Sequence, residues 1–379
     1  MIYLDHAATT KISPAARDAM IAALDTYGNP SSVHTLGQQA SAELGRARET
    51  IARQLGASPR EIYFTSGGSE GDNQALLTGA KNGAAAGKRH IISTAMEHHA
   101  VLHTLEALEQ QGFSVTYLKP DSEGGISPRQ LEEAIRPDTA LVSVMYVNNE
   151  TGSIQPIREL AAVCHGHEIP LHTDAVQAVG HIPVDVKADG VDFLTLSAHK
   201  FHGPRGIGAL YVRRGIRLHS LIDGGGQERG KRAGTENLPG IAGMAAALEE
   251  ETAQLKKHMD YVEGLRNTLV AGLREIPHAR INESPQHHAP GIVNVSFAGV
   301  EGESLLLLLD GAGICASAGS ACSAGSLEPS HVLLSMGIPR DIAQGSLRLS
   351  LDHSNTPEEV AETIAQVRAV VERLRKMRR

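Results

Sequence analysis

Short apolar runs alternate with helical patterns through the first two thirds of the chain, and this alternation constrains the possible fold most strongly. Candidate buried strands lie at residues 62–64, 91–92, 141–145, 169–171 and 193–196. Most are followed by a segment whose apolar residues recur at helical spacing. Such alternation predicts an α/β fold with a mainly parallel sheet and helices on both faces. In that architecture, ligands bind beyond the carboxyl ends of the strands.

The pattern changes after about residue 255, where a long helical stretch leads to a strand candidate at 292–297 and a Gly- and Ser-rich segment. A chain of 379 residues is also long for one core. We therefore expect a large domain over residues 15–255. Residues 1–14 and 256–379 would together form a smaller α+β domain.

Two helices have clear start signals. Ser13 and Pro14 are typical of an N-cap and a first helical residue, and we expect this helix to stop at Gly28. Thr356 and Glu359 form the capping-box pattern at the start of the last helix.

Charge and hydropathy exclude several classes of function. The formal net charge of -8 argues against nucleic-acid binding, which needs a basic face. The longest run of leucines, 305–309, is too short to cross a membrane. An odd count of 3 cysteines fits a reducing compartment, and we expect a cytoplasmic protein. Cys164, His165 and His167 lack a fourth ligand, so we expect no metal.

Polar residues follow two of the predicted strands. Lys200 comes after the strand at 193–196, beside Ser197 and His199, where it could be an exposed loop charge or could bind an aldehyde cofactor covalently. Asp174 ends another strand and could be an N-cap or the carboxylate that keeps a pyridine nitrogen protonated. Together, these two residues indicate a site for pyridoxal phosphate.

A glycine turn and a histidine add weaker signals. Residues 67–69 lie between a strand and a helix start, where backbone N–H groups favour a phosphate, but the turn lacks the Walker A spacing. His98 begins a helix and could cap it or act as an acid/base group over a cofactor ring.

The chain resembles the cysteine desulfurases of the NifS/IscS type along essentially its whole length. The segments that carry this resemblance occur in the family's order and are residues 5–10, 28–32, 65–73, 97–98, 148–150, 174–177, 197–200, 232–237 and 319–322. The family consists of fold-type-I enzymes of the class-V aminotransferase group, which are homodimers. They use pyridoxal phosphate to convert L-cysteine to L-alanine and leave a persulfide on the enzyme.

The resemblance implies a role for each matching residue. Lys200 would bind the cofactor, Asp174 would pair with its ring nitrogen, and His98 would stack on the ring as the acid/base group. The other implied ligands are Asn149 and Gln177 near the ring hydroxyl, Gly68, Ser69, Ser197 and His199 at the phosphate, Thr235 from the partner subunit, and Arg348 with Asn149 at the substrate carboxylate.

Cys322 matches the family's persulfide-forming cysteine. It lies in a stretch of small residues that we expect to be mobile, whereas Cys164 lies in an apolar helical run and Cys315 in a candidate strand. The segment 330–333 resembles the subgroup that supplies sulfur to iron-sulfur scaffolds, although the acceptor itself is left open.

The chain also departs from the family pattern in places. Asp352 and His353 stand where the family usually has Gly or Ser followed by Arg. Alternative functions are selenocysteine lyase or another class-V aminotransferase or lyase reaction. A binding protein or scaffold without catalysis is a further alternative, but it would not require Lys200, Asp174, His98 and Cys322 together.

Overall fold

The computed structural model describes residues 1–318 and 328–377. Within them, a sheet of seven strands has the spatial order β2-β8-β7-β6-β5-β3-β4. Its strands are β2 (Ile62–Thr65), β3 (His90–Thr94), β4 (Ser114–Leu118), β5 (Thr139–Ser143), β6 (Leu171–Asp174), β7 (Phe193–Ser197) and β8 (Gly208–Val212). β8 pairs antiparallel with β2 and β7, and the other pairs are parallel. The predicted α/β class with a mainly parallel sheet is confirmed.

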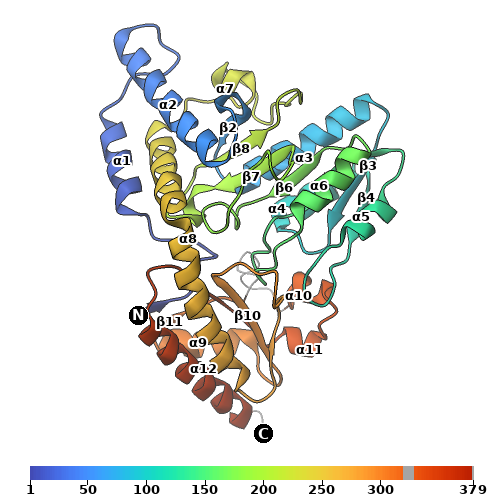
Figure 1. The fold of residues 1–379 in the computed structure, drawn as a ribbon, viewed down its shortest axis with the longest axis vertical. Coiled ribbons are helices and arrows are strands. Elements are labelled where there is room, and N and C mark those ends of the chain that lie inside the picture. Colours follow the sequence, from blue (N-terminus) through green and yellow to red (C-terminus); the bar gives the residue numbers. More distant parts are fainter. Residues whose placement is uncertain (319–327, 378–379) are drawn as a thin grey trace.

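Helices cover both faces of this sheet (Figure 1). They are α2 (Thr35–Gln54), α3 (Gly68–Ala85), α4 (His99–Glu109), α5 (Pro128–Ala134), α6 (Ile157–Gly166) and α8 (Leu238–Arg274), with α1 (Pro14–Leu24) packed on α8. The short helices η1 (Pro59–Glu61), η2 (Ala198–Lys200) and α7 (Gln227–Gly230) lie in connections. Ser13 caps α1 as predicted, but α1 ends at Leu24 and not at Gly28.

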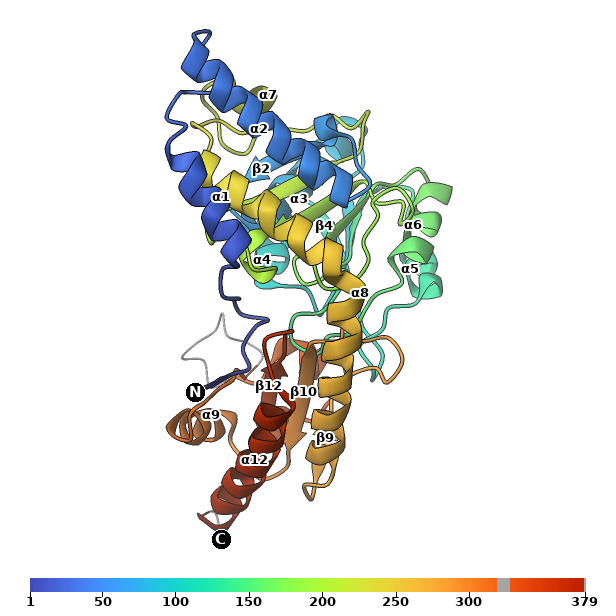
Figure 2. The same cartoon turned by 60° about the vertical axis from the view of Figure 1, so that its left-hand side comes forward.

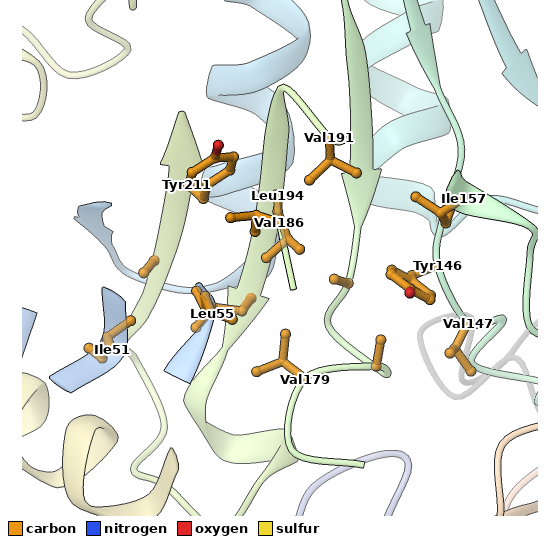
Figure 3. Close-up of a cluster of buried hydrophobic side chains, with 14 of the residues drawn as sticks. Ile51, Leu55, Tyr146, Val147, Ile157, Val179, Val186, Val191, Leu194 and Tyr211 are labelled. Atoms are coloured by element: carbon orange, nitrogen blue, oxygen red, sulfur yellow. The ribbon is translucent and has the colours of Figure 1, made fainter. Parts of the chain in front are cut away.

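The buried strands divide their side chains between two layers because successive residues of a strand point to opposite faces. Phe193 packs with α3 and α4, whereas Leu194 packs with the core that includes α2, α6 and α8. Ile91 and Ile92 divide in the same way. Figure 3 shows part of the second layer, with side chains from α2 beside those of the strands. Burial on both faces explains why these strands are nearly uniform apolar runs.

A second group of strands lies below the seven-stranded sheet (Figure 1). β10 (Ile292–Phe297) pairs antiparallel with β9 (Ala279–Ile281) and β12 (Ser346–Ser350), while β1 (Ile2–Tyr3) pairs parallel with β11 (Ile314–Cys315). The helices nearby are α9 (Gly302–Gly311), α10 (His331–Ser335), α11 (Arg340–Ala343) and α12 (Pro357–Met377). The predicted capping box of α12 is present, with Thr356 and Glu359 each accepting from the other's backbone N–H at 3.2 Å.

The helix α8 connects the two groups of strands, as Figure 2 shows most clearly. Ile241 and Leu248 belong to the core under the seven-stranded sheet, whereas Leu265 and Leu269 belong to the core around β10 and β12. The expected domain boundary at residues 255–256 falls inside this continuous helix, and the domain division remains a proposal. Among the described residues, no helix combines the length and apolar character needed to cross a membrane.

We predict that Leu269→Ala lowers the free energy of unfolding by about 2–5 kcal/mol, because Leu269 is 0% exposed and its loss leaves a cavity. Leu307→Ala is the matched control, since Leu307 on α9 is 69% exposed and its replacement should change stability by about 0.5 kcal/mol or less. Urea unfolding followed by circular dichroism measures both. Equal losses from the two variants would contradict the assigned second core.

Candidate active site

The carboxyl ends of the parallel strands meet at one edge of the large sheet and bring the predicted residues together. Asp174 ends β6 and lies opposite Thr195 of β7. β7 ends at Ser197, and the short helix η2 that follows carries His199 and Lys200. Because β6 and β7 are neighbours, these polar side chains occur on adjacent chain segments.

A cavity of about 340 Å³ lies at the same edge, where β2 leads into α3. Its lining residues are Thr9, Ser66, Gly67, Gly68, Ser69, Glu70, Ser197, His199, Arg205 and Gly206. Four of the predicted phosphate ligands, Gly68, Ser69, Ser197 and His199, therefore share one cavity. Backbone N–H groups at the start of α3 and the exposed cation Arg205 make this cavity suited to an anion.

Glycine is required where the backbone forms this cavity. Gly67 has φ 153°, which side-chain-bearing residues rarely adopt. A Cβ on Gly68 would lie 2.8 Å from Val176 Cγ2, and one on Gly208 would lie 2.4 Å from Leu196 O. These glycines therefore allow β2, β8 and β7 to approach one another closely where the chain turns into α3.

Lys200 is held beside the cavity by the N-terminal segment. Its Nζ donates hydrogen bonds to Ala7 O at 2.6 Å and to Ala8 O at 2.8 Å. Gln177 Nε2 donates to the same Ala7 carbonyl at 2.8 Å. Two predicted ligands, Lys200 and Gln177, therefore converge on one backbone oxygen.

Asp174 is a buried carboxylate, and burial together with the negative charge of Asp72 raises its pKa to about 7. The charge of His98 acts in the opposite direction. Asp174 Oδ1 accepts a hydrogen bond from the backbone N–H of Val176 at 2.9 Å. A protonated ring nitrogen would supply the positive charge that this carboxylate needs, so the residue fits its expected role toward pyridoxal phosphate.

His98 is the N-cap of α4, as one of the two sequence alternatives proposed, and it also interacts electrostatically with Asp174 and Lys200. Its Nδ1 accepts the backbone N–H of Ala100 at 3.1 Å. Burial is the main cause that lowers the pKa of His98, and the charge of Lys200 adds to it. The neutral imidazole therefore carries its proton on Nε2.

The second group of strands contributes Arg348, which is 2% exposed on β12. One of its terminal nitrogens, Nη1, donates to Asn149 O at 2.8 Å, and the other, Nη2, to Asp5 Oδ1 at 3.0 Å. The structure thus joins two predicted substrate ligands, Arg348 and Asn149, from opposite parts of the fold.

Thr235 and Cys322 do not have a described place in this site. Thr235 is exposed and is absent from the lining residues of the cavity. Cys322 lies outside the described residues. The described segments on either side of it contact the site, because Ser317 N donates to Arg348 O at 3.2 Å and the Ser330 hydroxyl donates to Glu150 Oε2.

Three residues that line the cavity were not predicted from the sequence. Thr9 and Arg205 line the cavity, and Glu70 holds Arg232 in an ion pair of 2.9 Å at the cavity wall. The run 5–10 and the Gly-Pro-Arg-Gly turn after Lys200 were visible in the sequence, but they gave no indication of which side chain faces the site. Glu97, next to His98, was also given no role.

Glu97 is fully buried at this edge of the sheet. Thr94 Oγ1 and Met145 N donate to its Oε1 at 2.7 and 3.0 Å. Burial nevertheless raises the pKa of Glu97 to about 8 from an ordinary value of 4.5. The carboxyl group is therefore mostly neutral in the folded protein at neutral pH.

Comparisons with known proteins identify similar chains of nearly equal length. The sequence model of the class-V aminotransferase family matches residues 2–362. The protein described as "Cysteine desulfurase IscS" of Methanosarcina thermophila is 48% identical over 377 residues, which are 99% of this chain and 93% of that protein. The protein of the same description from Clostridium botulinum is 45% identical and covers 99% of this chain and 96% of its own length.

A solved structure described as a NifS-like protein has the same fold. It superposes with a TM-score of 0.92 at 40% identity and covers 98% of this chain and 99% of its own.

The raised pKa of Glu97 predicts a pH dependence of stability. A neutral carboxyl favoured by the fold contributes stability that is fully present below pH 4.5 and is lost as the pH rises toward about 8. We expect the thermal unfolding midpoint to fall over this range in the parent protein and to fall less steeply in Glu97→Gln. The control is Glu133→Gln, since Glu133 is 62% exposed. If the unfolding midpoint changes with pH equally in the parent and in Glu97→Gln, the raised pKa assigned to Glu97 is refuted, whatever the absolute stabilities.

Proposed function

The chain belongs to the class-V aminotransferase family and is one of its pyridoxal-phosphate-dependent cysteine desulfurases, and we propose that it passes the sulfur of L-cysteine to Cys322. The organic product is L-alanine. The proposal assigns cofactor binding to Lys200, proton transfer to Lys200 and His98, and recognition of the substrate carboxylate to Arg348 and Asn149.

The observation that carries this proposal is the convergence at one sheet edge. His98 interacts electrostatically there with both Lys200 and Asp174, beside a cavity built from a glycine turn and a helix start. Gly68, Ser69, Ser197 and His199 would hold the phosphate. Gln177 and Asn149 would lie near the ring hydroxyl, and Asp174 would face the ring nitrogen.

The cofactor supplies an electron sink that stabilises negative charge at the α-carbon of the substrate. Lys200 is the base we assign to the α-proton, because its Nζ is already directed to the cavity edge by two backbone carbonyls. Asp174 would hold the ring nitrogen in its protonated form, which makes the cofactor a better electron acceptor. His98 can donate a proton from Nε2, because its Nδ1 accepts the Ala100 N–H and burial favours the neutral imidazole.

Cys322 completes the reaction in this proposal. Its thiolate attacks the sulfur of the bound cysteine, the carbon-sulfur bond breaks, and a persulfide remains on Cys322. Alanine formation requires one hydrogen at the α-carbon and one at the β-carbon. The enzyme's acid/base groups deliver both, after taking them from the substrate and from the Cys322 thiol. The balanced result is one cysteine and one enzyme thiol giving one alanine and one enzyme persulfide.

The oligomeric state and the partners of the enzyme are also proposed. We propose a homodimer in which Thr235 reaches the phosphate site of the partner subunit, consistent with its exposure outside its own cavity. An acceptor thiol would remove the sulfur by exchange, and an iron-sulfur scaffold is the acceptor class that the segment 330–333 suggests. A cytoplasmic location rests on the cysteine content alone.

The test of this function is replacement of Cys322. We predict that Cys322→Ala retains the bound cofactor but releases no sulfide from cysteine, because no other thiol takes its place. In the parent protein, peptide mass analysis after incubation with cysteine should find one added sulfur atom on Cys322. Alanine should form without any keto-acid acceptor, which separates this reaction from transamination.

Cys164→Ala is the matched control and should release sulfide normally. Burial and the charge of Asp192 raise the pKa of the Cys164 thiol to about 12, so this thiol is not ionised at neutral pH. Normal sulfide release by Cys322→Ala would overturn the proposed mechanism.

Arg348→Ala should raise the KM for cysteine by roughly ten- to a hundredfold, because charge-assisted hydrogen bonds contribute about 1.5–3 kcal/mol. Asp5→Asn provides the control, since it removes the ion pair to Arg348 and leaves the guanidinium in place. Its KM should change much less. Steady-state alanine formation measures both variants. An unchanged KM in Arg348→Ala would assign the substrate carboxylate to another residue.

A further inference from the structure

Three side chains that the desulfurase reaction does not use form a compact cluster at the junction of the two cores. His202 follows η2, Glu251 lies in the middle of α8, and His353 follows β12. One potential ligand atom from each lies within 4.8 Å of the other two. We propose that these residues bind one divalent transition-metal ion, with Zn²⁺ as the ion that fits best.

His202 is oriented as metal-binding histidines are. It is 7% exposed, and its Nδ1 lies 2.9 Å from the carbonyl oxygen of Lys11. A carbonyl oxygen only accepts, so Nδ1 carries the proton and Nε2 presents its lone pair. A backbone carbonyl that fixes the tautomer of a ligand histidine is a common outer contact at metal sites.

The burial of Glu251 also favours a cation. The residue is 5% exposed, and a carboxylate shielded from water is stabilised by a nearby positive charge. A divalent ion would supply that charge, and a neutral histidine ring is the form that binds it.

His258 supports this arrangement from the next turns of α8. Its Nδ1 lies 3.1 Å from Glu251 Oε2, and its ring stacks on that of His353 with centroids 4.0 Å apart. One contact holds the carboxylate and the other holds the imidazole. Both proposed ligands therefore have a neighbour that limits their rotation.

Two imidazoles and one carboxylate are a ligand set that zinc accepts, with bonds of about 2.0–2.2 Å and a fourth position for water. Tetrahedral zinc places its ligand atoms roughly 3.3 Å apart. The ligand atoms lie within 4.8 Å of one another, so their separations must shorten by up to about 1.5 Å when the ion binds. Asp352 is beside the cluster, 3.5 Å from His202 Nε2, but it is already engaged by His6 at 2.9 Å.

The position of the cluster gives the ion a structural consequence. His353 belongs to the segment between β12 and α12, whereas His202 belongs to a loop of the seven-stranded sheet. Glu251 lies on the helix that packs on both cores. A bound ion would connect these three segments and should stabilise the folded state by binding it in preference to the unfolded chain.

The test uses the full-length holoenzyme in a Cys322→Ser background, which removes the catalytic thiol as a competing zinc ligand. After treatment with a chelator, equilibrium dialysis against Zn²⁺ should give one ion per chain. Glu251→Gln and His353→Asn should each weaken zinc binding at least tenfold. His103→Asn is the control, because His103 is an exposed histidine on α4, and its zinc binding should equal that of the parent.

Thermal unfolding gives a second readout that does not depend on activity. Zinc should raise the unfolding midpoint of the parent and of His103→Asn, and should leave that of Glu251→Gln unchanged. The absorbance of the bound cofactor, measured without zinc, shows whether each variant is folded. Both Glu251→Gln and His353→Asn are tested, so that the comparison remains possible if one of them fails to fold. Absence of zinc binding at tenfold molar excess, or equal affinity in parent, Glu251→Gln and His353→Asn, would overturn the proposal. The desulfurase proposal is tested separately through sulfide release.

Discussion

The parallel pairing of β6 with β7 fixes the position of the candidate active site. Asp174 lies opposite Thr195 in that register, so the strand ends that follow place Asp174 beside the segment of Ser197 and Lys200. Both strands are buried on both faces, and a shift of one residue would turn apolar side chains of each strand to the wrong layer. The packing of the core therefore determines the geometry of the site.

The site combines this rigid frame with buried carboxyl groups whose charged forms oppose stability. Glu97, Glu150 and Asp174 all have raised pKa values because burial disfavours their charged forms. Ionising such a group costs free energy in the folded state, and a cationic ring nitrogen would favour the charged form of Asp174. The surrounding apolar layers on both faces of the sheet offset that cost.

The N-terminal segment joins the site to the second core. Ala7 accepts hydrogen bonds from Lys200 and Gln177 through its carbonyl, while its own N–H donates to Ser350 Oγ at 2.9 Å. Asp5 forms an ion pair with Arg348, which lies on β12 together with Ser350. A movement of β12 relative to the large sheet would thus reach Lys200 and Arg348 together.

The sequence alone predicted the fold class, the strand-end position of Lys200 and Asp174, the capping box of α12 and the family. These features depend on local periodicity or on residues adjacent in the chain, which a sequence displays directly. It misjudged the end of α1, where the chain leaves the helix at Asp25 well before Gly28.

Contacts between residues distant in the chain could be identified only in the three-dimensional structure. The cavity position of Thr9 and Arg205, the contact of Arg348 with Asn149, and the cluster of His202, Glu251 and His353 all join residues far apart in the sequence. No spacing rule connects such positions, because their separation along the chain is set by intervening helices and strands. Their proximity is a property of how the two cores pack around α8.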